Sequence, residues 1–516
     1  MIDLAQGYMA KYERAKTIRR EFEDLYDEIF EYTLPQRQGF KNYTPGQRRD
    51  DRIFDETAVV GVQEFASRLQ SGLVPNFARW ADFVAGGEVP EEEQDEVNNK
   101  LDKVTEYIFE IIQTSNFAQE IHECFIDLAL GTAVLAITEG DAINPIRFHS
   151  IPLPHVVLDV GPDGRIDHVY RERDLKYEDL PVAYPRGTFS EKTLEKIQKY
   201  PDSKCKILEV SCKLYDQPNV ERYSYMVIEM GDKQLILQEE YSGVGSNPFV
   251  AFRWSKASGE IYGRGPAVNA LSAIKSANLT IELVLENAQM AISGIYQMDD
   301  DGVINVDTIN LVPGTVIPKA PNSQGLQPIR AAGNFDVANL ILNDMRNNIK
   351  RALYNDMLGD PNKTPASATE VAERMADLSR KIGSAFGRLQ AEMVQPVLQR
   401  VVYLLTKQGR IEIPTVNGRE VKIKSVSPLA QAQSNQDIVS LDRFLEMVAG
   451  RFGPDVINLL VSSEETAIYL AKKFGVPDHL IRDVGERKQM VEMAQQMQQQ
   501  TGIDPNANPN IQTLGG

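Results

Sequence analysis

The longest helical pattern in the chain runs from Ala366 to Gly409, where apolar residues recur every three to four positions. A polar loop, Asn355–Pro365, comes directly before it. At about 1.5 Å per residue, a helix of this length would span on the order of 60 Å, about twice the width of a small domain. We therefore expect it to act as a strut or to pack against a neighbouring subunit. Bends are expected at Gly383, Gly387 and Pro396.

The chain before this helix has a helical part, a β-rich part and a second helical part. Amphipathic patterns predict the first helices at about 3–31, 55–71, 97–114 and 117–130. The acidic stretch Glu88–Glu96 is predicted to be a connector. From about 132 to 254, short β-like runs alternate with turn residues, which predicts a mixed α/β unit with a small antiparallel sheet or barrel. Turns are expected at Pro162–Gly164 and Gly231–Asp232, and a helical insert at Ser190–Lys199.

The second helical part begins at Pro266, a residue suited to a first helical turn, and continues to about Ile292. A short β-like stretch, Gly294–Phe335, separates it from another helix at about Asp336–Tyr354. This order predicts an extended antiparallel helix pair joined by a compact β module.

Strand character returns after the long helix, at Arg410–Val426 around a turn at Asn417–Gly418. Helices are then predicted at about 436–449, 454–473 and 478–500, followed by a polar tail that we expect to be disordered. The whole chain is therefore predicted to be α+β and mainly helical.

Composition places the chain among ordinary globular proteins, with 516 residues, 42% apolar and 25% charged. The length allows two to four domains. A net charge of −18 argues against a protein that grips nucleic acid over its whole surface, because such binding needs many cations on phosphates. Three widely spaced cysteines fit a reduced cytosolic setting, and we expect neither a signal peptide nor a membrane-spanning helix.

The sequence contains neither the phosphate-binding G-x-x-x-x-G-K-[ST] motif nor the nucleophile motif G-x-S-x-G. The run Gly263–Pro266 is interpreted as a loop leading into a helix, and Asp299–Gly302 as a solvated turn rather than a cation site. His149 and His155 flank the run IPLP, for which a structural loop role is favoured over a site. We therefore expect no catalytic residue, no metal and no cofactor.

A basic segment lies between the first two helices. It carries five cations with two aromatic residues among them: Arg37, Lys41, Arg48, Arg49 and Arg52, with Phe40 and Tyr43. Such a pattern can serve phosphate backbones and base stacking. The same cations can equally pair with another subunit or with nearby acids, here Asp50, Asp51 and Asp55. Both interpretations remain open at this stage, with pairing favoured.

The order of the parts resembles the head-to-tail connector (portal) proteins of T7-like short-tailed bacteriophages. The resemblance covers roughly residues 5–480 and includes the run FRWSKASGEIYGRGPA ahead of the first long helix, the β module between two helices, and a loop bearing Pro and Lys. It also includes a turn into the very long helix with the sequence Ala368, Thr369, Glu370, Val371. That motif is weak alone, but its place after two helices and a loop is informative.

This resemblance implies a portal-type architecture with an α/β wing, a two-helix stem, a small β-rich clip, a long kinked helix and a helical C-terminal crown. The implied boundaries are wing 1–265, stem helices 266–292 and 336–354, clip 293–335, tunnel loop 355–365, long helix and return to the wing 366–426, crown 427–500 and disordered tail 501–516.

The resemblance also implies a function. Members of the family form a twelve-subunit ring at one capsid vertex, through which double-stranded DNA enters and leaves. The implied partners are other copies of the chain, that DNA, the large terminase, the major capsid and scaffold proteins, the tail adaptor and internal core proteins. The implied location is the virion, after assembly in the host cytoplasm, without a membrane partner.

Carried onto this sequence, the resemblance places Lys363 and Asn362 in the tunnel loop, and Lys350, Arg351 and Arg346 near the lower tunnel wall. Such cations would give weak, evenly repeated contacts to passing DNA, while a net-acidic wall discourages sticking. The plainer interpretation of Lys363 is a solvated loop lysine.

Two other functions were weighed. A nuclease or ATPase of phage assembly is disfavoured, because phosphoryl chemistry needs a metal or a phosphate cradle that the motifs do not supply. A scaffold oligomer without DNA would differ from a portal in lacking closed rings with an axial hole.

Overall fold

The computed structural model describes residues 2–37, 39–41, 52–217, 220–293, 296–297, 321, 327–328, 335–355, 381–414, 416–417, 419–452 and 461–474. Helices and antiparallel strands both contribute, which confirms the α+β prediction. The chain divides into two compact units. Unit 1 consists of Met1–Ser71, Ser115–Ser367 and Ile382–Arg400, and unit 2 of Gly72–Thr114, Ala368–Lys381 and Val401–Gly516. No helix in the described part of the chain is long and apolar enough to span a bilayer.

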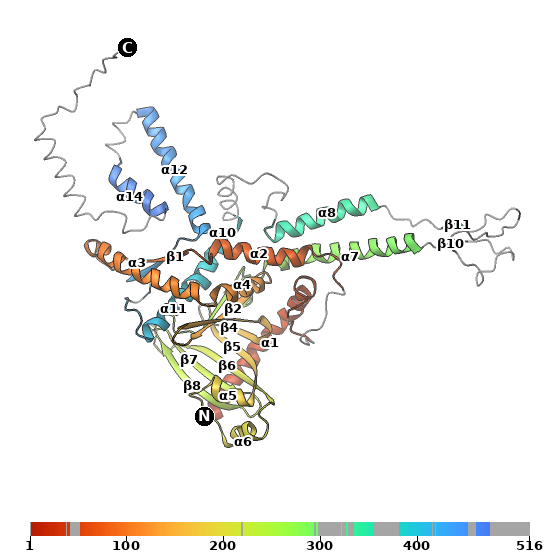
Figure 1. The fold of residues 1–516 in the computed structure, drawn as a ribbon, viewed down its shortest axis with the longest axis horizontal. Coiled ribbons are helices and arrows are strands. Elements are labelled where there is room, and N and C mark those ends of the chain that lie inside the picture. The colour runs from red at the N-terminus through yellow and green to blue at the C-terminus, as the bar shows by residue number, and fades with distance from the viewer. Residues whose placement is uncertain are drawn as a thin grey trace, which may run out of the picture. The chain divides into compact units, whose positions relative to one another are not determined.

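The larger sheet of unit 1 is an antiparallel meander of five strands in chain order (Figure 1). Its strands are β4 (Val156–Val160), β5 (Ile166–Lys176), β6 (Lys204–Leu214), β7 (Arg222–Glu229) and β8 (Gln234–Ser242). The predicted turns at Pro162–Gly164 and Gly231–Asp232 join β4 to β5 and β7 to β8, and are confirmed.

A smaller antiparallel sheet in unit 1 has the strand order β3-β2-β9. It consists of β2 (Thr132–Glu139), β3 (Ile146–Ile151) and β9 (Phe249–Arg253). Helix α4 (Phe117–Leu128), close to its predicted bounds, packs against β2 and β3. The prediction of an antiparallel sheet between 132 and 254 is therefore confirmed, with two sheets in place of one.

Helix α1 (Ile2–Thr33) covers one face of the five-stranded sheet and confirms the predicted first helix. Its small or aromatic residues Ala5, Tyr12 and Ala15 join a buried cluster with sheet residues that alternate along the strands. The sheet residues of this cluster are Val157, Tyr170, Leu208, Val210, Cys212, Met226 and Ile228.

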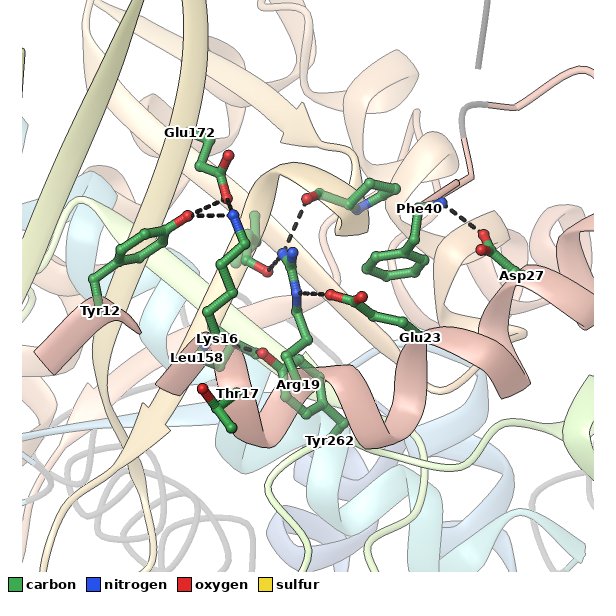
Figure 2. Close-up of polar contacts among 12 residues, drawn as sticks. Tyr12, Lys16, Thr17, Arg19, Glu23, Asp27, Phe40, Leu158, Glu172 and Tyr262 are labelled. Carbon is green, nitrogen blue, oxygen red and sulfur yellow. Dashed lines mark hydrogen bonds and ion pairs between the residues drawn. The ribbon is translucent and has the colours of Figure 1, made fainter. Parts of the chain in front are cut away.

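Arg19 fastens α1 to the chain around β4 (Figure 2). Its buried guanidinium donates hydrogen bonds to the carbonyl oxygens of Pro154 and Val156, at 2.9 and 2.8 Å. Nε donates to Glu23 at 2.8 Å, and the guanidinium lies 5.2 Å from the ring centre of Phe40. One side chain therefore holds the helix, the IPLP run and the start of the basic segment together.

The opposite face of the sheet buries a charge network under α5 (Leu180–Ala183) and the short 3-10 turn before it. Glu209 accepts hydrogen bonds from Tyr184 Oη at 2.6 Å and from Arg173 at 2.9 Å, and Arg171 lies 3.3 Å away. Burial alone would raise the pKa of Glu209, but the two arginines and Tyr184 outweigh it and lower the pKa. Helix α6 (Glu191–Lys199), capped by Ser190, confirms the predicted insert.

The described part of the long helix is uninterrupted, but the type of helix changes along it. It consists of α10 (Gly383–Leu389), a π-helical turn (Gln390–Val394) and α11 (Gln395–Lys407). The wide turn ends two residues before Pro396, which has no N–H to donate to residue 392. The expected irregularity near Pro396 is therefore a π-turn.

Glu392 and Arg400 attach this helix to the small sheet. Glu392 accepts three hydrogen bonds from Arg253, from its backbone N, Nε and a terminal nitrogen, at 3.0, 3.1 and 2.6 Å. Arg400 donates to the carbonyl oxygens of Ile137 and Ser246, at 3.2 and 2.8 Å. The helix segment from 382 to 400 is thus built into unit 1.

Unit 2 contains a strand pair of which the sequence predicted only the second strand. Strand β1 (Ala81–Ala85) pairs antiparallel with β12 (Val421–Ser425). At Gly86 a Cβ atom would lie 1.7 Å from the carbonyl oxygen of Arg419, so the close approach of the two backbones requires glycine. Arg410–Val426 was expected to be strand-like around Asn417–Gly418, but its described strand is only β12, and Gly418 lies outside the described residues.

Two helices of unit 2 start earlier than their periodicity indicates, whereas the predicted helix from 454 begins only at Ser463 in the described residues. Helix α3 (Glu91–Thr114) includes most of the stretch predicted as an acidic connector, so that prediction is wrong. Its Glu-rich start suits the positive end of the helix dipole. Helix α12 (Pro428–Phe452) is longer than predicted, and α14 (Ser463–Phe474) covers the end of the predicted 454–473 helix. The predicted helix at 478–500 lies outside the described residues.

Candidate functional site

Two helices of unit 1 lie side by side and form what we call the helix pair: α7 (Pro266–Ser293) and α8 (Phe335–Ala352) (Figure 1). Strands β10 (Tyr296–Gln297) and β11 (Gln327–Pro328) pair antiparallel in the segment between them. Both helices and the β character between them agree with the sequence prediction. The turn at Asp299–Gly302 lies outside the described residues.

The helix pair leaves large apolar side chains in solvent. Leu340 of α8 is 73% exposed and Leu283 of α7 is 51% exposed. Leu279, one helical turn before Leu283, is also exposed, as are Leu285 and Ile341. Such a group of exposed apolar residues on neighbouring helices is typical of a surface that is covered in an assembly.

A polar node attaches both helices to the segment before α2 (Thr57–Leu73). Asn278 of α7 accepts hydrogen bonds from the backbone N of Phe54 at 2.7 Å and of Asp55 at 3.2 Å. Asp55 in turn accepts from Arg346 of α8 at 2.8 Å and from the backbone N of Thr57 at 2.8 Å. Burial acts to raise the pKa of Asp55, but the bonds from Thr57 and Arg346 prevail and lower it.

The end of α8 is held against α2. The side-chain nitrogen of the buried Asn355 donates to the carbonyl oxygen of Gly61 at 2.7 Å, and Arg68 donates to that of Tyr354 at 2.5 Å. A Cβ at Gly61 would lie 2.7 Å from Leu353 Cδ1, so the two elements are in close contact. These bonds fix the chain at the point where the predicted tunnel loop begins.

The predicted DNA-contacting residues are only partly described. Lys350 and Arg351 are exposed in the last turn of α8, where cations are favourable at the carbonyl end of a helix. Arg346, by contrast, is engaged with Asp55. Lys363, Asn362 and the motif residues Ala368, Thr369, Glu370 and Val371 lie outside the described residues.

The described cations of the basic segment are paired with acids of the same chain. Arg37 binds Asp127 and Glu123, and Lys41 binds Asp24. Arg52 contacts Glu31 at 2.9 Å. These partners lie on α1 and α4. Asp50 and Asp51 lie outside the described residues, and Asp55 pairs with Arg346 of α8. Arg48, Arg49 and Tyr43 lie outside the described residues.

The histidines do not form a chemical site in the described residues. Burial lowers the pKa of His149, His155 and His168, and His122 Nδ1 lies 2.9 Å from Gln70. No group of three His, Cys, Asp or Glu side chains in the described residues is placed to hold a metal ion.

Comparison with known proteins gives this architecture a context. The family model for bacteriophage head to tail connecting proteins matches residues 5–481. A relative from Bordetella phage BPP-1, described as a probable portal protein, is 25% identical over 540 residues, covering 97% of this chain and 93% of the relative.

Two solved structures are similar at lower levels. A chain in the virion of a native gene transfer agent particle is 12% identical, with a TM-score of 0.36, over 86% of this chain and 99% of that one. A chain in the neck of an empty particle of this kind is 13% identical, with a TM-score of 0.35, over 80% and 89%. The family model by itself matches nearly the whole sequence. The chain therefore belongs to the family of bacteriophage head to tail connecting proteins, and is a portal-type structural protein rather than an enzyme.

Proposed function

We propose that this protein forms a closed ring at one vertex of a phage capsid and that double-stranded DNA passes through the ring during packaging and ejection. Family membership supports a place between head and tail. The observation that carries the ring is the exposed apolar surface of the helix pair, which has the character of a subunit contact. The proposed copy number is twelve, as in the T7-like connectors that the sequence resembles.

The proposed ring would also be a docking platform. The terminase motor would bind it during packaging, and tail adaptor proteins would replace the motor afterwards. The capsid, scaffold and internal core proteins would be further neighbours, with assembly in the host cytoplasm. The support for this role is the position of the protein, because a connector between head and tail has to contact both.

Charge fits a conduit that does not trap its cargo. The chain carries a net charge of −18, which repels a polyanion such as DNA. Lys350 and Arg351 at the end of α8 are exposed, and together with Lys363 and Asn362 they are the proposed weak contacts to DNA. Arg346 is a poorer candidate, because its guanidinium already binds Asp55.

Electron microscopy of the purified protein tests the ring. We expect closed rings with an axial hole wide enough for duplex DNA. Leu340→Glu should place a charge in the subunit contact and leave subunits that do not close into rings. Val182→Glu is the matched control, because Val182 is 83% exposed in α5, away from the helix pair. Open filaments or monomers from the unaltered protein would contradict the proposal.

The conduit needs a separate test. Lys363→Glu should change DNA packaging or retention while rings still form. Rings of normal appearance that package and retain DNA normally would remove Lys363 from the channel without affecting the ring itself.

A further inference from the structure

A small hollow in unit 1 lies beside the IPLP run and away from the helix pair. Its volume is about 260 Å³, below the roughly 300–1,000 Å³ that is typical of sites for drug-sized ligands. The residues that line the hollow come from three parts of the sequence: α1 with the basic segment, the acidic face of α4, and the IPLP run. Any ligand here must be small.

The described lining of the hollow combines apolar walls with three acidic residues, one arginine and one serine. Phe30 and Leu153 are buried side chains that form part of the wall, with Pro152 and Pro154 beside them. The acidic residues are Glu120, Glu123 and Asp127, which occupy one face of α4 at positions i, i+3 and i+7. Among the described residues of the lining, Arg37 is the one cation. Three carboxylates therefore face one guanidinium.

Asp127 is the residue that points to a missing partner. Its side chain is 2% exposed, and Oδ1 accepts a hydrogen bond from Arg37. Within the described residues, Oδ2 is buried and has no hydrogen-bond partner. Unpaired buried carboxylate oxygens are costly, and burial raises the pKa of Asp127 to about 6 although Arg37 opposes this. Among the described residues, no other group satisfies the second oxygen of this carboxylate.

The other two carboxylates leave room for a second cation. Glu120 accepts a hydrogen bond from the backbone N of Ser150 at 2.6 Å, and Glu123 binds Arg37 at the exposed rim. A metal ion is a poor fit, because no three acidic, His or Cys groups in the described residues have ligating geometry. A primary ammonium has three donors on a flexible alkyl stem, which suits scattered carboxylate oxygens and apolar walls.

We propose that this hollow binds an alkylammonium group, with Asp127 and Glu120 receiving its N–H donors and with Phe30 and Leu153 contacting its methylene chain. The ammonium belongs either to a free aliphatic diamine or to a lysine side chain. This site is independent of the proposed ring and conduit.

Calorimetric titration of the purified, assembled protein tests the site at pH 8, where Asp127 is ionised. The probes are 1,4-diaminobutane and a lysine blocked at both its amino and carboxyl groups. We expect at least one of the two probes to bind. If the natural ligand is a free diamine, 1,4-diaminobutane should bind more tightly than the blocked lysine. If the natural ligand is a lysine side chain, the blocked lysine should bind at least as tightly as the diamine. Asp127→Asn should weaken binding roughly tenfold, as expected for the loss of one charged hydrogen bond.

Two controls separate this site from the general attraction of a cation to an acidic protein. Glu110→Gln removes one exposed charge of α3 and should leave binding unchanged. Glu120→Gln should also weaken binding roughly tenfold. This variant replaces Asp127→Asn in the test if the circular dichroism spectrum shows that Asp127→Asn does not fold.

Four results would overturn the proposal: binding of neither probe, binding by the Asp127→Asn and Glu120→Gln variants as tight as by the unaltered protein, equally tight binding of 1,4-butanediol, or displacement of the diamine by stoichiometric MgCl₂.

Discussion

The five-stranded sheet and the helix pair place their apolar residues in opposite ways. The sheet buries Leu208, Val210 and Met226 beneath α1, and its charged groups find partners inside the same chain. The helix pair leaves Leu283 and Leu340 in solvent, although its two helices are each longer than four turns. The difference teaches that the sheet buries its apolar residues within the chain, whereas under the proposed function the surface of the pair would be covered by a neighbouring subunit.

The charge network of the sheet gives the largest expected effect. Glu209→Ala should cost about 3–5 kcal/mol of unfolding free energy, because it leaves Arg171 and Arg173 without their buried partner. The folded-state pKa of Glu209 lies below its usual 4.5. The stabilisation is thus full above that pH and is lost as the pH falls through the lower, folded-state value. Urea unfolding of the Glu209→Ala variant and the unaltered protein at several pH values measures both the loss of unfolding free energy and its pH dependence. A loss that does not change with pH would contradict the ionic explanation.

Arg19 tests how α1 is attached to the sheet. Arg19→Met should destabilise the protein by about 2–4 kcal/mol, because two carbonyl oxygens and Glu23 lose their donor. Arg20→Met is the matched control, since Arg20 is the next residue on the same helix and is exposed. Thermal melting compares them, and equal effects would show that Arg19 acts only through general helix stability.

Two glycine substitutions should have opposite signs. Gly61→Ala should cost about 1–3 kcal/mol, because the added methyl group meets the side chain of Leu353 at the end of α8. Gly7→Ala should stabilise by up to about 1 kcal/mol, because Gly7 lies in α1 with nothing within 4 Å of the added atom. A neutral Gly61→Ala variant would mean that Leu353 moves aside and that α2 does not hold α8 tightly.

The smallest effect on subunit stability is expected in the helix pair. Leu283→Ala should change the unfolding free energy of the unassembled subunit by no more than about 0.5 kcal/mol, because the side chain is half exposed. The same substitution in the sheet, Leu208→Ala, should cost about 2–5 kcal/mol. Comparing both variants by unfolding and by sedimentation tests the contrast. It fails if Leu283→Ala destabilises the subunit as much as Leu208→Ala does.

Sequence periodicity predicted the elements that carry a strong local signal. Helices α1 and α7 and the hairpin turn at Pro162–Gly164 lie close to their expected positions, because an amphipathic stripe or a turn residue is written within a few residues. Strand β1 was missed, because it is short and its partner β12 lies more than 300 residues away. The start of α3 was missed, because charge rather than apolar spacing marks its first turn.

The polar contacts of the candidate site could not be predicted from local sequence patterns, for a related reason. Arg346 and Asp55 are 291 positions apart, and Arg37 and Asp127 are 90 apart, so only the fold brings their charges together. The sequence did show the cations: pairing with nearby acids was favoured for the basic segment, and Arg346 was placed near the channel only by the family resemblance. For Lys363 and the A-T-E-V motif, the prediction stays untested.

The node around Asp55 has a mechanical consequence. A force applied along the helix pair would load several side-chain bonds at once: Lys275 to Glu28, Asn278 to the 52–55 segment, and Arg346 to Asp55. Bonds that carry a shear force together resist a larger force than bonds that break one after another. These side chains would therefore carry part of such a force into α1 and the 52–55 segment, in addition to the part carried along the backbone.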